Sequence, residues 1–249
     1  MNALRPLILA AGLLLAWQAL VWLSGVPAYI LPGPLPVAQA LVRHAPVLAN
    51  HLGTTLAEIL LGLTLGTLFG STAALVMILS PLLRRWMLPV LVVSQAIPVF
   101  ALAPILVLWL GYGLASKVGM AVLIIFFPVA SGFFSGMRRT DRDLLELARI
   151  MGARPSKILS TIVIPSALPA FAAGLRVATA VAPIGAVVGE WVGSSAGLGF
   201  YMLHANARMQ IDVMFAALTI LAAVSLALYF LVDRLLDRIV FWQPKQGIS

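Results

Sequence analysis

Long apolar runs, separated by short polar or proline-containing stretches, dominate the pattern of hydrophobic and polar positions along this chain. A helix needs about 20 predominantly apolar residues to cross a bilayer core. Six runs of roughly this length occur: Leu7–Leu23, Thr55–Leu79, Met87–Leu110, Val118–Gly136, Leu168–Val192 and Val213–Val232. The pattern therefore predicts an all-α membrane protein with six transmembrane helices.

The first apolar run and the segment after it need separate interpretation. The run follows Arg5, as in a secretory signal, but it is long and contains Trp17 and Trp22 without a convincing small-x-small cleavage site. We therefore expect a retained helix. The segment Val26–Pro36 holds four prolines, which cannot continue a helix interior, and the next stretch, Val37–Leu48, is weakly amphipathic. This part is expected to cross and lie along the surface.

Composition supports lipid as the solvent of this chain. Its 249 residues are 62% apolar and only 10% charged, whereas soluble domains are near half apolar and about a quarter charged. A folded soluble enzyme is therefore excluded. The chain has no cysteine, which also excludes disulfide, thiolate and iron–sulfur chemistry. The net charge of +8 leaves nucleic acid or an anionic membrane surface as its partner.

The positions of the basic residues distinguish these two partners. With the N-terminus inside, twelve Lys and Arg fall in inner segments: Arg5, Arg84, Arg85, Arg138, Arg139, Arg142, Arg149, Arg154, Lys157, Arg234, Arg238 and Lys245. Only three, Arg43, Lys117 and Arg208, fall in outer segments. Because Lys and Arg concentrate in short cytoplasmic loops, both termini are predicted to be cytoplasmic. The charge then faces anionic lipid, and no nucleic acid is expected.

Glycines and prolines within the runs predict how the helices pack and bend. Small residues on one face permit close approach of helices in lipid, so we interpret glycines spaced by four as packing seams. They are Gly62, Gly66 and Gly70, then Gly132 and Gly136, then Gly185, Gly189 and Gly193. Prolines inside spans remove a backbone hydrogen bond and favour kinks; these are Pro98, Pro104, Pro128 and Pro183.

The segment Met137–Ala167 is the one long loop of the predicted inner face, and it carries six of the sixteen basic residues. Its first helix is predicted to begin in a capping box, in which the Thr140 hydroxyl accepts from the amide of Asp143. It is predicted to end at Gly152 in a left-handed cap. The apolar residues between these points exceed what so short an exposed helix should show, so we expect something to cover them.

A second helix is predicted in the same loop. Pro155 starts it, it continues through Ile158–Ile164, and Pro165 ends it.

The loop resembles a known family. Glu146-Leu147-Ala148, three residues, Gly152, nine residues and Ile162-Val163-Ile164-Pro165 are similar to the EAA loop of permease subunits of binding-protein-dependent ABC importers. That pattern is E-A-A, three residues, G, nine residues, I-x-L-P. Leu147 and Ile164 depart from it, while the spacing is met without a gap. The likeness extends from about His51 to Trp242.

Within this family the chain looks most like the nitrate, sulfonate and taurine branch. The similar stretches are Ile97-Pro98, Ala103-Pro104, Trp109–Gly113, Ser116-Lys117, Gly174–Arg176 and Gly197–Gly199. Ser94–Pro98 and Gly185–Gly193 look closer to a sub-branch for thiamine pyrimidine precursors. Glu58 stands where the sulfonate-type proteins usually carry Arg, which weakens a sulfonate assignment.

The resemblance implies a type I ABC importer permease fold with these divisions: an N-terminal helix and surface segment in 1–49, the permease domain in 50–240 and a cytoplasmic tail in 241–249. It also implies a second copy of the chain, two cytoplasmic ATPase subunits and an extracytoplasmic solute-binding protein in a bacterial inner membrane. The chain lacks a G-x-x-x-x-G-K-[ST] phosphate loop. We therefore expect it to bind no cofactor, with ATP and Mg²⁺ used by the partner ATPase.

The same resemblance predicts which residues couple the chain to its ATPase. They are Leu144, Glu146, Ala148, Arg149, Gly152, Ala153, Ile162 and Pro165. Gln95, Glu58 and Glu190 are our candidates for the translocation pathway, because polar groups at membrane depth usually face protein or water. Glu190 can equally sit at the headgroup level beside Trp191. For Arg176, near the inner end of its span, a structural role is favoured.

Other site chemistry finds little support. His44, His51 and His204 are all predicted to be extracytoplasmic, without metal-ligand spacing, so no metal site or catalytic residue is expected. The outer loop Ser194–Asp212 can receive the solute-binding protein. Its Gly197-Leu198-Gly199 is weak evidence for dinucleotide binding, because no strand precedes it.

Two other classes of protein are alternatives to an importer permease. An intramembrane enzyme would need a nucleophile–base pair or metal ligands inside the spans, and no His or Asp lies there. An ATP-independent secondary carrier would have no reason for a capped apolar helix with this motif. An importer permease with a thiamine pyrimidine precursor as solute is the preferred reading, and a sulfonate, taurine or nitrate importer is the alternative.

Overall fold

The structure is a computed structural model that describes residues 4–242, with side chains from residue 8 onward. The predicted tail beyond residue 242, which includes Lys245, and the side chain of Arg5 lie outside this described part. All regular elements of residues 4–242 are helical, as the sequence predicts.

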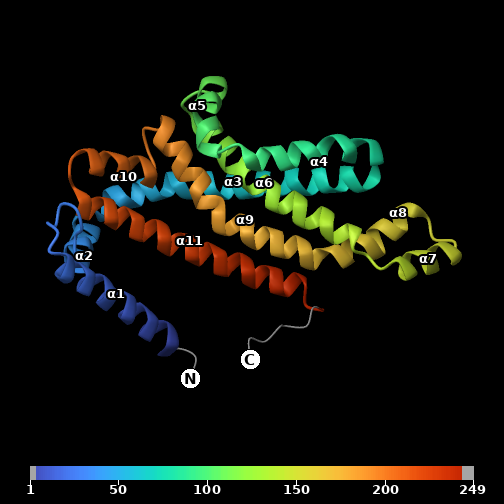
Figure 1. Cartoon of the computed structure of the whole chain (residues 1–249), viewed down its shortest axis with the longest axis horizontal. Coiled ribbons are helices and arrows are strands. Elements are labelled where there is room, and N and C mark those ends of the chain that lie inside the picture. Colours follow the sequence, from blue (N-terminus) through green and yellow to red (C-terminus); the bar gives the residue numbers. More distant parts are fainter. Residues whose placement is uncertain (1–3, 243–249) are drawn as a thin grey trace.

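Eleven α-helices and one π-helical turn follow each other along the described chain (Figure 1). Their bounds are α1 Leu4–Ser24, α2 Pro34–Arg43, α3 Ala45–Leu79, α4 Pro81–Ala96, α5 Val99–Leu110, α6 Leu114–Arg138, α7 Arg142–Ile150, α8 Pro155–Ile158, the π turn η1 Leu159–Val163, α9 Ile164–Gly193, α10 Leu198–Ala207 and α11 Ile211–Ile239.

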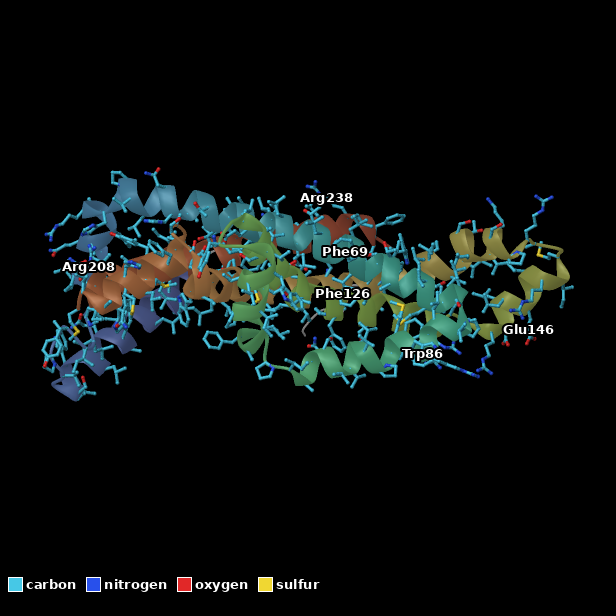
Figure 2. All side chains as sticks on the ribbon, turned by 90° about the horizontal axis from the view of Figure 1, so that it is seen from above. Phe69, Trp86, Phe126, Glu146, Arg208 and Arg238 are labelled. Carbon is cyan, nitrogen blue, oxygen red and sulfur yellow. The ribbon has the colours of Figure 1, made fainter. Side chains whose placement is uncertain are left out.

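The molecule is elongated, and its long helices run between two ends with different contents. Helices α7 and α8 lie at one end, which we call the α7 end, whereas α2 and α10 lie at the opposite one, the α10 end (Figure 1). In the view from above, Glu146 and Arg208 mark these two extremes (Figure 2). Helices α3, α6 and α9 run along this axis toward the α7 end, whereas α11 runs from the α10 end beside α9 and stops short of α7 (Figure 1).

Four helical segments are each long and apolar enough to cross a membrane: α3, α6, the continuous Pro155–Gly193 and α11. The pair α4 and α5 counts as a fifth only if it is treated as one bent span. The apolar part of α1 is shorter. The predicted span Met87–Leu110 is broken at Pro98, one of the prolines expected to bend its helix, into α4 and α5. The count of six spans and the location of the termini stay predictions.

Proline explains why Met87–Leu110 is broken. Helices α4 and α5 meet at 105°, and the break lies at Ile97 and Pro98. A residue before proline is pushed out of the helical region, and Ile97 has extended φ and ψ of −85° and 120°. Proline also has no amide hydrogen to continue the helix. Pro104, Pro128 and Pro183, in contrast, lie inside continuous helices.

The predicted surface segment Val37–Leu48 is also divided. Helix α2 ends at Arg43 and α3 begins at Ala45, ten residues before the predicted start of the second span at Thr55. Pro46 occupies the first turn of α3, where its missing amide hydrogen costs nothing. The amphipathic stretch therefore caps the α10 end as two helices that meet at His44.

The glycine seams are confirmed, and they place α6 between α3 and α9. On α3, Gly62, Gly66 and Gly70 lie against Ala121, Ile125 and Val129 of α6, respectively. On the other side of α6, Gly132 meets Gly174, Gly136 meets Ala170, and Gly185 meets Ala121. In each case a side chain at the glycine would collide with the facing helix. These contacts align three helices that carry residues to both ends.

Apolar clusters complete the packing at each end. At the α7 end, residues of α3, α4, α6 and the loop helices form one buried cluster, including Met77, Phe133, Phe134, Ala148 and Ile158. At the α10 end, α2, α3, α10 and α11 share another, including Val37, Leu48, Leu198, Met202 and Val213. Both end segments are thus packed on the central helices.

We predict that replacing Gly185 by alanine destabilises the protein. A methyl group there would lie 2.6 Å from Cα of Ala121, a backbone atom that cannot turn aside, so a cost of about 1–3 kcal/mol is expected. Thermal unfolding of purified protein in detergent measures it. Gly53 is the matched control, because nothing lies within 4 Å of a methyl group at that helical position. A Gly185→Ala variant as stable as Gly53→Ala would contradict the seam.

Candidate functional site: a capped surface helix and a buried polar cluster

Helix α7 begins with a cap that differs from the predicted one. The Asp141 side chain accepts from the Asp143 amide at 2.9 Å and serves as the N-cap. The predicted capping role of Thr140 is wrong, because its buried hydroxyl donates instead to the Met137 carbonyl at 2.9 Å. Thr140 thus closes the end of α6, and the next residue is free to start α7. Asp143 in the first turn suits the helix dipole.

The end of α7 confirms the left-handed turn predicted at Gly152. This glycine has φ of +76°, and the Ala153 amide donates back to the Ala148 carbonyl at 3.0 Å. The Gly152 amide donates to the Arg149 carbonyl at 2.9 Å. Residues with a Cβ are strained in this region of φ and ψ. The chain therefore leaves α7 sharply and returns toward the central helices.

The second predicted helix of the loop is only partly correct. Pro155 does start α8, but Pro165 does not end the helix, which continues through η1 into α9 as far as Gly193. A π turn uses an i→i+5 bond pattern, and it lies directly before Ile164, where α9 begins. Pro165 then lies at the start of α9, directly after η1. It has no amide hydrogen to donate to the preceding turn of this continuous helix, so the irregular bonding of η1 lies beside a proline.

The predicted coupling residues divide between an exposed surface and the core of the α7 end. Ala148 is buried, while Ala153 and Ile162 pack partly against the same cluster. Gly152 is exposed at the turn, and Pro165 is half-buried. Glu146 and Arg149 are exposed, together with four apolar side chains of one surface: Leu144, Leu147, Ile150 and Met151, the last two 84% and 77% exposed. We call these four residues the α7 patch.

Gln95 lies apart from the other two predicted pathway residues. It is exposed near the end of α4, beside the break at Pro98. Together with Ser94 it lines a cavity of about 360 Å³, whose other walls come from Ile97, from Val99 at the start of α5, and from α6 and α9. Ile124, Phe127, Pro128, Val177 and Val181 are among these wall residues. The amide of Gln95 is thus one of few polar groups beside an otherwise apolar hollow.

Glu190, in contrast, is enclosed near the α10 end. Its side chain is 1% exposed. One oxygen, Oε2, accepts from the backbone amides of Gly199 at 2.5 Å and Phe200 at 3.3 Å. The other, Oε1, accepts from the Thr55 hydroxyl at 2.6 Å. Burial of a carboxyl is costly without such donors, and here two come from the first turn of α10.

Two other side chains also accept hydrogen bonds from backbone amides at the start of α10. The Leu198 amide donates to Thr55 Oγ1 at 2.8 Å, and the Gly197 amide donates to His51 Nδ1 at 3.1 Å. The first amides of a helix have no partner within the helix itself. In α10, four consecutive amides, Gly197 to Phe200, are therefore satisfied by side chains from α3 and α9.

The glycine pair Gly197 and Gly199 has a steric role in this arrangement. Gly197 has φ of +108°, which L side chains rarely adopt. A methyl group at either position would overlap the Glu190 carboxyl, at 2.7 Å from Oε2 for Gly199. The Gly197-Leu198-Gly199 motif thus makes room for a carboxyl from the same chain.

Glu58 lies beside Glu190 in the same enclosed region. It is 0% exposed, it is within electrostatic range of both Glu190 and Lys117, and neither of its oxygens meets hydrogen-bond criteria with a described atom. Lys117 is also buried, and its Nζ donates to the carbonyls of Tyr112 at 3.1 Å and Gly113 at 3.3 Å. Of the three predicted pathway residues, Glu58 and Glu190 are therefore neighbours, whereas Gln95 lies apart from them.

The three histidines also gather at the α10 end. His51 stacks on Tyr201 with ring centroids 4.8 Å apart, the Tyr201 hydroxyl faces His44 Nδ1 at 3.4 Å, and His204 lies against Phe200 at 4.0 Å. Burial raises the pKa of the Tyr201 hydroxyl above its ordinary value. Within the described residues, no group of three or more His, Cys, Asp or Glu is arranged to hold a metal ion.

Arg176 joins α9 to α11. Its Nε is 2.5 Å from Asp233 Oδ1, and its Nη2 is 2.7 Å from Asp237 Oδ1. The guanidinium thus bridges two carboxylates, four residues apart on α11, through one charge-assisted hydrogen bond to each. This contact agrees with the structural role favoured for Arg176.

Sequence reasoning missed Thr55, His51, Gly197 and Gly199 as members of one polar cluster. Thr55 and Glu190 are 135 residues apart, so no local pattern connects them. A signal did exist, because a glutamate at the end of an apolar run is followed seven residues later by glycine-x-glycine.

Comparison with known proteins defines the class to which this architecture belongs. A family model described as "binding-protein-dependent transport system inner membrane component" matches residues 62–242. The chain belongs to this family of ABC transporter permeases. It is therefore a multi-pass transport subunit of a bacterial inner membrane and not an enzyme.

Individual relatives span nearly the whole chain. A probable ABC transporter permease protein of Haemophilus influenzae is 54% identical, covering 96% of this chain and 97% of that protein. The formylaminopyrimidine transport permease protein ThiX of Halalkalibacterium halodurans is 36% identical, with 98% of each chain covered. The riboflavin transport system permease protein RibX of Chloroflexus aurantiacus is 40% identical over 93% of this chain and 87% of that protein.

A solved structure supports the fold. A chain of the MetNI methionine ABC transporter, in an inward-facing form, is similar with a TM-score of 0.66 at 20% sequence identity. The similarity covers 82% of this chain and 98% of that chain. The helical arrangement is thus that of an ABC importer permease.

Proposed function

We propose that this chain forms half of a homodimeric translocation pathway, powered by two cytoplasmic ATPase subunits that dock on the α7 patch. The observation that carries this proposal is the exposure of four apolar side chains on a short helix closed at both ends by its own caps. An amphipathic helix of this kind buries its apolar face in a partner's groove. ATP and Mg²⁺ are used by the ATPase, and this chain binds no cofactor.

The loop is built to pass a displacement of α7 to the membrane helices. Ala148 and Ile158 anchor α7 and α8 in the same cluster as Phe133, Phe134 and Met77 of the central helices. From Pro155 the chain is helical without interruption to Gly193. Closure of the ATPase dimer would thereby tilt α9 as a rigid body and alternate the opening of the pathway.

Charge supports the orientation in which the α7 end is cytoplasmic. The basic residues of α4, of the end of α6 and of the loop that follows gather there: Arg84, Arg85, Arg138, Arg139, Arg142, Arg149, Arg154 and Lys157. Trp86, next to Arg85, lies toward the same end as Glu146, and Arg208 lies at the other (Figure 2). This asymmetry follows the positive-inside rule, and the α10 end would receive the solute-binding protein.

For the solute we propose a small heteroaromatic nutrient, with a thiamine pyrimidine precursor first. The support is the similarity to a formylaminopyrimidine permease and to a riboflavin permease. Gln95 is the residue we assign to contact with the solute, because its amide opens onto the cavity between α4, α6 and α9. An apolar hollow with one or two polar groups suits a flat, partly polar ring.

A charge reversal on α7 and a new charge within the α7 patch test the docking. We expect Glu146→Lys and Ile150→Glu to reduce co-purification of the ATPase by at least about tenfold. Ile150→Glu places a charge without a partner in an apolar contact, which costs several kcal/mol, and Glu146→Lys reverses the charge that borders this contact. Affinity capture of the tagged permease with its ATPase measures this. Lys157→Glu is the control, since it changes an exposed charge outside the patch and outside α7. Undiminished assembly in both α7 variants would refute the docking.

Replacement of Gln95 tests the pathway. In reconstituted complex, Gln95→Ala is expected to lower solute uptake about tenfold while ATPase assembly is retained, because one good hydrogen bond is worth about 1 kcal/mol or more in a dry site. Ser94→Ala, on the same cavity wall, is the comparison. Uptake at the wild-type rate in Gln95→Ala would exclude this residue from solute contact.

Calorimetry of the partner solute-binding protein tests the substrate. We expect micromolar or tighter binding of formylaminopyrimidine-type compounds, which corresponds to about −8 kcal/mol or better. Riboflavin, taurine and nitrate are titrated in parallel. Tight binding of taurine or nitrate without pyrimidine binding would replace the proposed solute and leave the permease assignment intact.

A further inference from the structure

The start of α10 is held by buried side chains of two other helices. Four successive amides donate to His51, Thr55 and Glu190, and Thr55 also donates to Glu190 at 2.6 Å. The Tyr201 amide then donates to the Gly197 carbonyl at 3.0 Å, which begins the regular bonding of α10. The four amides that begin α10 are thus all satisfied by side chains of the protein.

We propose that Glu190 is a positioning residue for transport: it fixes α10 to α9, so that a solute-binding protein seated on α10 acts directly on α9. This inference rests on the proposed function and deepens it. Glu190 is 1% exposed in this structure. Its partners are all protein atoms of α3 and α10.

The strength of this attachment follows from its chemistry. Glu190 accepts three hydrogen bonds, from Gly199, Phe200 and Thr55, and a water-poor surrounding strengthens each of them. Gly197 and Gly199 let the backbone approach the carboxyl closely, because each lacks the side chain that would overlap it. Helix α10 therefore cannot shift along α9 without exposing a buried carboxyl.

The outward surface of α10 is free for a partner within this chain. His204, Ala207 and Arg208 are exposed there, whereas Leu203 and Asn206 line a hollow of about 850 Å³ together with residues of α9 and α11. Arg208 lies at the extreme of the α10 end (Figure 2). Protein–protein interfaces combine apolar contacts with a polar rim, so a surface of this mixed composition suits contact with a folded protein domain. The family description names dependence on a binding protein, which is the partner to which the proposal commits.

Helix α9 provides the connection to the opposite end. It is continuous through η1 with α8, which packs in the cluster beneath α7. Glu190 lies three residues from the other end of the same helix, at Gly193. One helix thus links the surface for the binding protein to the surface for the ATPase, and Glu190 is where α10 is joined to it.

The test is the ATPase rate of reconstituted wild-type and variant complexes as liganded binding protein is titrated. Loss of the attachment in Glu190→Ala should raise the half-saturating concentration of binding protein at least about fivefold, the lower range of coupling between distant sites. Gly199→Ala should act in the same direction, because its methyl group displaces the carboxyl. Glu190→Gln keeps an acceptor oxygen for the Gly199 amide and should stay within about twofold of wild type.

Asp212→Asn is the matched control, because it removes an outer carboxylate from the first turn of α11, away from the start of α10. A purely structural role of Glu190 would lower the amount of assembled complex and its maximal rate, without moving the half-saturating concentration. That result, in folded Glu190→Ala or in Gly199→Ala if the former does not fold, overturns the proposal. Wild-type complex that shows no stimulation by any binding protein overturns the proposed function itself.

Discussion

Close backbone approach between α6 and its two neighbours is the constraint on which the rest of this structure depends. In lipid, apolar side chains gain little by leaving one apolar surrounding for another, so dispersion contact between well-fitted surfaces must hold helices together. Gly62, Gly66 and Gly70 provide that fit on one side of α6, and Gly132, Gly136 and Gly185 on the other. The α7 patch and the polar cluster at α10 keep their positions because these three helices are locked.

The features predictable from sequence are those encoded by local spacing. Glycines four residues apart define a helix face, and the left-handed turn at Gly152 follows from the residue type itself. Geometry that depends on competition between neighbours was not predictable. Asp141 caps α7 because Thr140 is used by α6, and no single-residue preference ranks these two outcomes.

Long-range polar contacts are the second kind of feature that could not be predicted from the sequence. Glu190 was expected to face a pathway or the headgroups, since an isolated carboxyl in an apolar run has few other uses. Its actual donors lie on α3 and α10, and the pairing with Thr55 requires the fold to be known. The glycine pair at 197 and 199 is the local sign of a backbone that closely approaches a carboxyl. A glycine-x-glycine pattern alone does not say which group the backbone approaches. Backbone amides at the start of α10 donate hydrogen bonds to this carboxyl of the same chain, as amides at a helix start do to a bound anion.

The π turn at Leu159–Val163 has a consequence for how this loop can vary. A π turn accommodates one residue more than an α-helical turn of similar rise, so the side chains before it are rotated relative to the face of α9 that packs on α6. The angular setting of α7 and α8 is thereby separated from the glycine seam. A change of one residue in the length of this turn would therefore rotate α7 and α8 about the helix axis while leaving the packing of α9 on α6 unchanged.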